Sequence, residues 1–130
     1  MPKKYRNKDV SSVGWYVASY IERSKYVGED DANENKRCVA WENTILIKAS
    51  NPDEAYEKAI EEANIGREPY ENSDGEMIQF VFEGLTSLLP IYEELEHGSE
   101  IMWTEHENKA IKTIKSMVKS KSELEVFSNE

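Results

Sequence analysis

Residues 38–64, CVAWENTILIKASNPDEAYEKAIEEAN, contain the strand and the helix that decide the fold. Successive side chains of a β-strand point to opposite faces of its sheet, and between Cys38 and Ala49 both faces are apolar. One face carries Val39, Trp41, Ile45 and Ile47, and the other carries Cys38, Ala40, Thr44 and Leu46. A strand that is apolar on both faces is typical of the middle of a sheet. We therefore expect a central strand over residues 38–49.

The helix that follows carries its own start and stop signals. Asn51 is a good N-cap, Pro52 fits the first helical position, and Glu54 stands three residues after the cap. Gly66 is placed to end the helix. This pattern predicts a helix over residues 52–64, with an inner stripe of small and apolar residues: Ala55, Tyr56, Ala59, Ile60 and Ala63.

Toward the N-terminus, alternation predicts a first strand over residues 15–21. Residues 22–37 are polar and contain Gly28, so we expect a long exposed connection. Residues 1–13 carry four lysines or arginines without apolar periodicity, which indicates a flexible basic tail.

Toward the C-terminus, the turn signal at residues 72–75 predicts a third strand from Met77, with a bulge at Gly84. His97-Gly98 is typical of a hairpin turn, and we expect a fourth strand over residues 99–107. Residues 108–121 are amphipathic, with a stripe of Ala110, Ile111, Ile114, Met117 and Val118 opposite lysines. The sequence therefore predicts a last amphipathic helix, and contact between this basic helix and the acidic body would offset some internal repulsion.

These elements define one fold class. We expect an α+β protein with a four-stranded, mainly antiparallel sheet, a helix between strands two and three, and a C-terminal amphipathic helix. The chain has 130 residues, which is enough for one core of this kind. The expected organisation is a tail over 1–13, a single domain over 14–121 and a C-terminal tail over 122–130.

The most informative functional feature is acidity. Residues 41–108 contain seventeen Asp or Glu against three Lys or Arg, and the whole chain has a net charge of −10. Such a field repels nucleic acid and anionic membranes and attracts basic protein surfaces. The sequence also lacks an apolar run long enough for a secretory signal or a membrane span. With a single cysteine, Cys38, we expect a cytoplasmic protein without an internal disulfide.

Residues that could carry chemistry do not form a recognisable constellation. His97 and His106 lie nine residues apart, and a transition-metal site needs three or four converging ligands. Glu29, Asp30, Asp31 and Glu34 are acidic but lack the alternating spacing of a calcium loop. Cys38 falls in a predicted strand without a basic neighbour. We expect no catalytic residue, no metal ion and no cofactor.

Aromatic residues give the other candidate site. Three predicted strands are apolar on both faces, whereas the helices can cover only one face fully. This imbalance predicts an aromatic groove or a surface for self-association, and its candidate residues are Trp15, Trp41 and Tyr92.

Several short motifs resemble a bacterial family catalogued as domain of unknown function 4288. They are Trp15-Tyr16-Val17-Ala18, Trp41-Glu42, the stretch 49–59, Tyr70-Glu71-Asn72 before Asp74-Gly75, and Phe82-Glu83-Gly84-Leu85. The resemblance covers about residues 14–106. It implies a bacterial source and an α+β fold, and it brings no activity, catalytic residue or cofactor.

Two functional hypotheses follow from these patterns. The first is a non-catalytic interaction module, similar to an immunity protein or antitoxin, whose acidic surface binds a basic protein through Glu57, Glu61, Glu62, Glu93, Glu94 and Glu96. The alternative is a small-molecule-binding or enzymatic domain that uses the aromatic groove as a homodimer.

Overall fold

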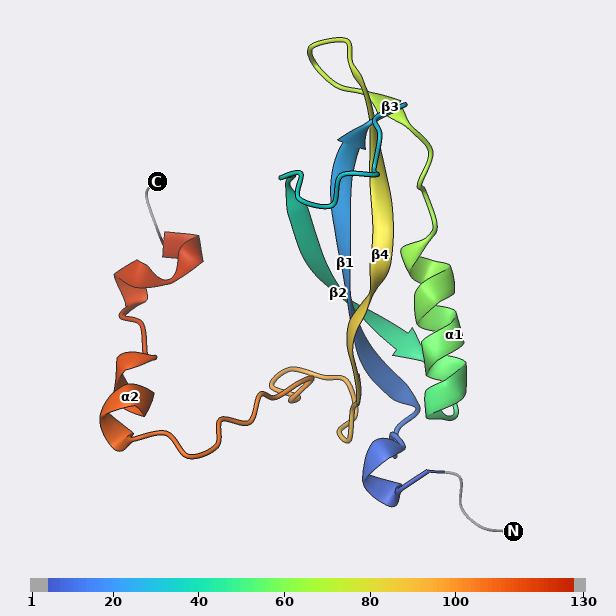
Figure 1. The fold of residues 1–130 in the computed structure, drawn as a ribbon. Helices are drawn as coiled ribbons and strands as arrows, with labels where there is room; N and C mark the ends of the chain where they lie inside the picture. The colour runs from blue at the N-terminus through green and yellow to red at the C-terminus, as the bar shows by residue number, and fades with distance from the viewer. Residues whose placement is uncertain (1–4, 128–130) are drawn as a thin grey trace.

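A computed structural model of the chain describes residues 5–127, and its central element is a four-stranded antiparallel sheet (Figure 1). The strands are β1 (Trp15–Tyr26), β2 (Ala40–Lys48), β3 (Tyr70–Glu71) and β4 (Met77–Pro90). The helices are α1 (Pro52–Ala63) and α2 (Ile111–Ser116), with three short 3-10 helices, η1 (Asn7–Asp9), η2 (Lys121–Glu123) and η3 (Glu125–Phe127). The predicted α+β class is confirmed.

The strand order, β2-β1-β4-β3, corrects one prediction. The first strand is central and β2 is an edge strand, so the placement of residues 38–49 at the centre of the sheet was wrong. Cys38 precedes β2 and is exposed rather than buried. Apolar residues on both faces of β2 therefore leave part of its surface open, and Leu46 is 48% exposed.

The strand β1 extends through the polar residues Glu22–Tyr26, which the sequence pattern assigned to a loop. These residues pair with β4, from Glu22 opposite Phe82 to Tyr26 opposite Ile78. The connection to β2 consequently spans only residues 27–39. The backbone hydrogen bonds of residues 22–26 to the apolar strand β4 stabilise a β-strand there despite the polar side chains.

The helix α1 forms as predicted and covers one face of the sheet (Figure 1). Its fully buried residues Ala55 and Ala59 pack against Tyr16 and Ala18 of the central strand. Small side chains at these positions let the helix lie close to the strands. Tyr56 was assigned to the inner stripe, but it is 48% exposed, because it lies one residue beyond the row of alanines.

The C-terminal quarter of the chain differs most from the prediction. Residues 99–107 form no strand, and the fourth strand is instead the short β3, which pairs with the start of β4. The predicted helix over 108–121 is reduced to the six residues of α2, and it does not pack on the body. We call residues 101–127, all of which are exposed, the arm.

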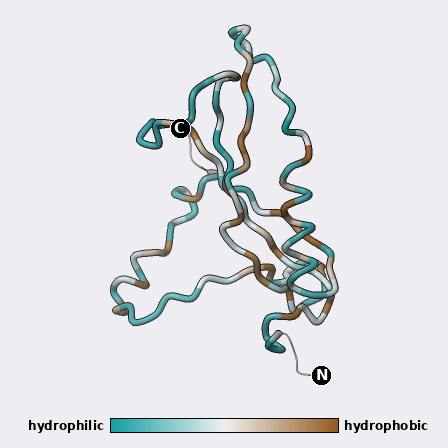
Figure 2. The backbone as a smooth tube through the Cα atoms, turned by 45° about the vertical axis from the view of Figure 1, so that its right-hand side comes forward, coloured by the Kyte–Doolittle hydropathy of each residue, from teal (hydrophilic) through white to brown (hydrophobic). Residues whose placement is uncertain are grey.

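The path of the arm explains why these predictions failed. It leads away from the sheet (Figure 1), and Figure 2 shows hydrophobic residues spaced along it as well as on the strands beside α1. A strand needs a neighbour for its backbone hydrogen bonds, and a short helix needs a surface for its apolar stripe. Neither partner is supplied within the described chain.

The segment before β1 is tied to the body. Ser11 is buried, and its hydroxyl donates a hydrogen bond of 2.5 Å to the carbonyl oxygen of Ile91. The Ser12 hydroxyl donates to the carbonyl oxygen of Tyr92 at 3.1 Å. Residues 1–4 of the predicted basic tail and 128–130 of the predicted C-terminal tail lie outside the described residues.

Candidate interaction surface

Six glutamates predicted to bind a partner are all exposed. Three of them, Glu57, Glu61 and Glu62, lie on α1, and Glu93, Glu94 and Glu96 lie in the turn after β4. None forms an ion pair with a lysine or arginine of residues 5–127. The Glu93 carboxylate accepts a hydrogen bond of 2.7 Å from the backbone N–H of Glu100, which fixes the shape of the turn. These carboxylates therefore present their charge to solvent from two separate elements.

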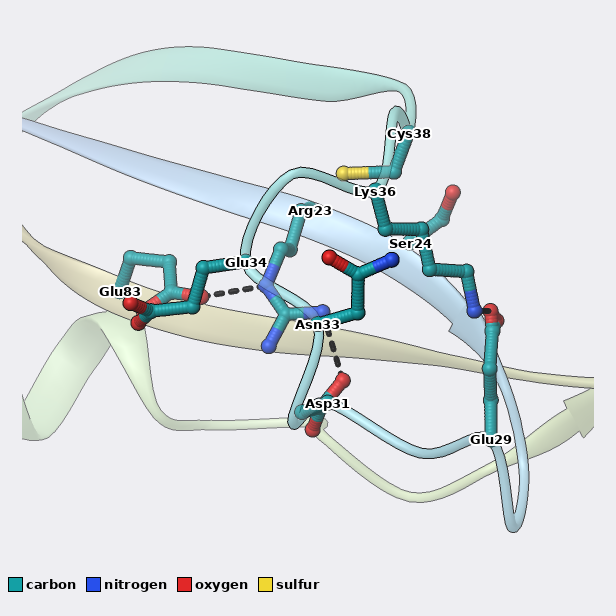
Figure 3. A pocket seen from close by; sticks show the side chains of 9 residues that line it. All are labelled: Arg23, Ser24, Glu29, Asp31, Asn33, Glu34, Lys36, Cys38 and Glu83. Carbon is teal, nitrogen blue, oxygen red and sulfur yellow. Dashed lines mark hydrogen bonds and ion pairs between the residues drawn. The ribbon is translucent and has the colours of Figure 1, made fainter.

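Other acids, by contrast, are neutralised inside the fold. A cavity of about 260 Å³ lies where the 27–39 connection covers the sheet (Figure 3). It is lined by Arg23, Ser24, Glu29, Asp31, Asn33, Glu34, Lys36, Cys38 and Glu83. Arg23 pairs with Glu83 and, at 3.2 Å, with Asp31. Lys25 also pairs with Asp31, at 2.8 Å.

These contacts shift the pKa values so that both the acids and Arg23 are favoured in their charged forms. Hydrogen bonds from Lys25 and then Arg23 lower the pKa of the Asp31 carboxyl. The Lys36 ammonium lowers the pKa of Glu29, with help from the backbone N–H of Tyr26. Hydrogen bonds to Glu83 and Asp31 raise the pKa of Arg23. The Asp31, Glu29 and Arg23 side chains are therefore held in their charged forms by an ion-pair network, and Glu34 lines the same cavity without an ion pair among the described residues.

The histidines and Cys38 do not converge on a site. His97 lies in the turn after β4 and His106 in the arm, and both are exposed. Over residues 5–127, no three His, Cys, Asp or Glu side chains come together in a geometry that could hold a metal ion. The acids Asp30 and Glu34 are exposed in the 27–39 connection, next to the ion-paired Asp31.

The three aromatic groove candidates lie apart. Trp15 and Trp41 fall on opposite faces of the sheet, because Trp41 stands opposite Glu22, which is seven positions after Trp15 on β1, and an odd separation along a strand changes the face. Lys48 lies over the Trp15 ring, with its Nζ 5.9 Å from the ring centroid. Tyr92 lies after β4 and stacks on Trp103 of the arm, with 5.8 Å between ring centroids. They do not line one groove.

Trp41 instead belongs to an aromatic patch on the face of the sheet that also carries α1. Its ring meets Phe80 edge-on at 5.3 Å, and Phe80 stacks on Tyr70 at 5.8 Å. Tyr20 and Phe82 continue the patch, with 5.8 Å between their centroids. Trp41 and Tyr70 are 42% and 45% exposed, so the patch is accessible at its edges.

Sequence reasoning missed Arg67, which closes this patch beside α1. Its guanidinium lies 5.8 Å from the Tyr20 ring centroid and pairs with Glu22, while Nε donates to the carbonyl oxygen of Ala63 at 2.8 Å. An arginine just after a helix end can bond to the last carbonyls. The sequence Gly66-Arg67 after the helix carried that signal.

No α-helix of residues 5–127 packs on the opposite face of the sheet. Register places Leu46, Val17 and Leu89 side by side on it, with Ile21 four residues further along β1. The 27–39 connection covers the part of this face near Arg23 and Lys25, but Leu46 and Ile21 remain 48% and 37% exposed. We call this region the open face.

Comparison with known protein families shows to which family the chain belongs. A sequence model of the family described as "Domain of unknown function (DUF4288)" matches residues 15–103. The chain belongs to this family. The DUF4288 match contains the whole sheet, α1 and the turn with Glu93, Glu94 and Glu96, and it ends at Trp103, before α2. No curated protein and no solved structure matches the chain.

No helix in the described part of the DUF4288 chain combines the length and the apolar character needed to cross a bilayer.

Proposed function

We propose that this DUF4288 protein is a non-catalytic interaction module of the bacterial cytoplasm whose acidic surface binds a basic protein. The sharpest form of this proposal is an immunity-like or antitoxin-like role, in which the module masks a cationic surface of its partner. The residues that we assign to the contact are Glu57, Glu61, Glu62, Glu93, Glu94 and Glu96.

One observation carries this proposal: the acids divide into two classes. Asp31, Glu29, Glu83 and Glu22 are matched by arginine or lysine within the fold. The six assigned glutamates belong to the exposed acids that lack such partners among the described residues, and α1 and the turn after β4 each carry three of them. An unneutralised carboxylate surface steers a cationic partner toward it and raises the association rate.

The test is a pair of charge reversals with the same net charge. In the first variant the six assigned glutamates become lysine. In the matched control, lysine replaces six exposed acids elsewhere on the chain: Glu34, Glu68, Glu71, Asp74, Glu105 and Glu107. The tagged proteins are used to capture partners from the native host, followed by mass spectrometry.

We expect the wild type and the control to retain one basic protein and the first variant to lose it. Binding of that protein should weaken steeply as salt is added, because exposed charges are screened. Equal loss of binding in both variants would mean that binding depends only on net charge, which contradicts the assigned surface. Equal retention in both would mean that the six glutamates do not take part in the contact.

A second candidate function is favoured by the aromatic patch. Trp41, Phe80 and Tyr70 form a continuous, partly exposed set of rings, and flat apolar ligands bind such surfaces. Tryptophan fluorescence tests it: a saturable change on addition of a metabolite, absent from Trp41→Leu, would support a ligand site. No change with any ligand would favour the interaction module.

A further inference from the structure

We propose that the arm of one copy packs on the open face of a second copy, so that two chains exchange arms and form a homodimer. This inference goes beyond the proposed function and does not depend on it.

The first argument is the amount of exposed surface. The chain exposes 10388 Å² for a mass of 15.0 kDa. A compact monomer of this mass exposes about 7,000 Å², so the excess is on the order of 3,000 Å². A stable interface of standard size buries about 800 Å² on each partner. The chain therefore carries more uncovered surface than a dimer needs.

The second argument is the composition of the arm. It exposes large apolar side chains along its whole length, among them Ile101, Trp103, Ile111, Ile114, Met117 and Phe127. Its helix α2 has six residues, whereas isolated helices shorter than about 12 residues are marginal in water. Such a segment needs a surface on which to bury its stripe.

The third argument is that the open face supplies a matching surface. Leu46 and Ile21 are 48% and 37% exposed on it, beside the buried Val17, and this face lies opposite the one that α1 covers. Leu46 also borders a crevice at the edge of β2 that is lined by two lysines, Lys48 and Lys58, and by two glutamates, Glu61 and Glu62. An occupant that brings apolar side chains to the exposed Leu46 and Ile21 fits this surface.

The net charges of the arm and of the acidic body favour the arm as the occupant. Residues 109–121 of the arm contain five lysines and no acid, whereas residues 41–108 carry a local charge of −14. Lys109, Lys112 and Lys115 form no ion pair with a described residue. The arm leads away from its own sheet (Figure 1), so the acidic body that receives it belongs to a second copy. Reciprocal exchange gives a closed, two-fold symmetric dimer.

The experiment measures the mass of the full chain in solution by sedimentation equilibrium. The arm variant is Ile111→Asp with Ile114→Asp, and its matched control places the same two charges on the other side of α2, as Thr113→Asp with Ser116→Asp. The face variant is Leu46→Asp. The substituted positions of the arm variant and its control lie outside the sheet and α1, so these substitutions leave the body unchanged. Leu46 lies in β2, and circular dichroism verifies that all three variants keep the fold.

We expect the wild type and the control to be dimeric, and the arm and face variants each to be monomeric at the same concentration. A mixture of the arm and face variants should regain a dimer, because one intact arm then meets one intact face. A monomeric wild type, a dimeric arm variant, or a mixture that stays monomeric would each overturn the proposal. These proteins retain all six assigned glutamates, so failure here leaves the partner proposal standing.

Discussion

The Arg67 guanidinium pairs with the carboxylate of Glu22, 45 residues earlier, and so fastens the end of α1 to the central strand. Both side chains are largely buried, with 18% and 16% exposed. Glu22 also accepts a hydrogen bond of 3.0 Å from the side-chain amide of Asn43 on β2. One charged cluster thus joins the helix, the central strand and the edge strand.

We expect Arg67→Met to lower the free energy of unfolding by about 2 kcal/mol, because it leaves the largely buried Glu22 carboxylate without its cation. Urea denaturation measures the effect. The control is Arg6→Met, which removes the exposed ion pair with Asp9 and should cost about 0.5 kcal/mol or less. Equal effects of the two substitutions would mean that the Arg67 contact adds nothing beyond a surface pair.

The N-terminus of α1 gives a second prediction. The Asn51 side chain accepts a hydrogen bond of 2.8 Å from the backbone N–H of Glu54. Asn51→Ala removes this acceptor and should cost about 1 kcal/mol in unfolding free energy, whereas Asn51→Ser keeps an acceptor and should cost much less. Thermal unfolding of the two variants checks this difference. If alanine and serine gave the same midpoint, the cap would contribute no stability.

The helix α1 could be predicted from sequence because its signals are local. Asn51, Pro52 and the alanine row lie within one stretch, and each acts through residues three or four positions away. The position of β2 at the edge depends instead on which strand pairs with β4 far along the chain. Apolar alternation fixes the faces of a strand but not its neighbours.

The candidate site was less predictable for the same reason. Exposure of the six glutamates followed from composition, but the division between paired and unpaired acids depends on contacts such as Lys25 with Asp31 and Arg23 with Glu83. The extension of β1 brings Arg23 and Lys25 onto the sheet, and the length of that strand was underestimated. Residues 99–121 have the periodicity of a strand and a helix, yet periodicity does not supply a partner for the apolar side.

The ion pairs of the 27–39 connection predict a response to pH. Lys25 and Arg23 lower the pKa of Asp31 below its ordinary value of about 3.9. A lowered pKa in the folded state means that the carboxylate contributes its full stabilisation above the ordinary value and loses it as pH falls through the lowered pKa. The connection should therefore stay closed at neutral pH and loosen only in strong acid.

An NMR titration of the Asp31 carboxyl measures this pKa directly. In Lys25→Met it should move back toward the ordinary value, because Lys25 is the largest cause of the shift. Lys8→Met removes a lysine from η1, outside this network, and should leave the titration unchanged. An Asp31 pKa that did not respond to Lys25→Met would contradict the ion-pair network.

The bulges of β4 lead to a last prediction. Phe82, Leu85 and Leu88 lie on the α1 side of the sheet, where they stand opposite Glu22, Tyr20 and Ala18 of β1. Residues on one face of a regular strand are two positions apart, whereas these three are spaced by three positions. The two register shifts account for the difference, because each inserts one extra residue into β4. Gly84 lies within the first shift and has φ of +154°, a conformation that residues with a Cβ rarely adopt.

We expect Gly84→Ala to lower the unfolding free energy by about 1 kcal/mol or more through backbone strain. A Cβ at this position meets no atom within 4 Å, so Gly84→Ser should cost nearly the same as alanine, because the penalty does not come from side-chain size. Urea denaturation of the two variants tests this equality. A neutral Gly84→Ala would show that β4 can shift its register at no cost, and the three-residue spacing of Phe82, Leu85 and Leu88 would then not depend on this glycine.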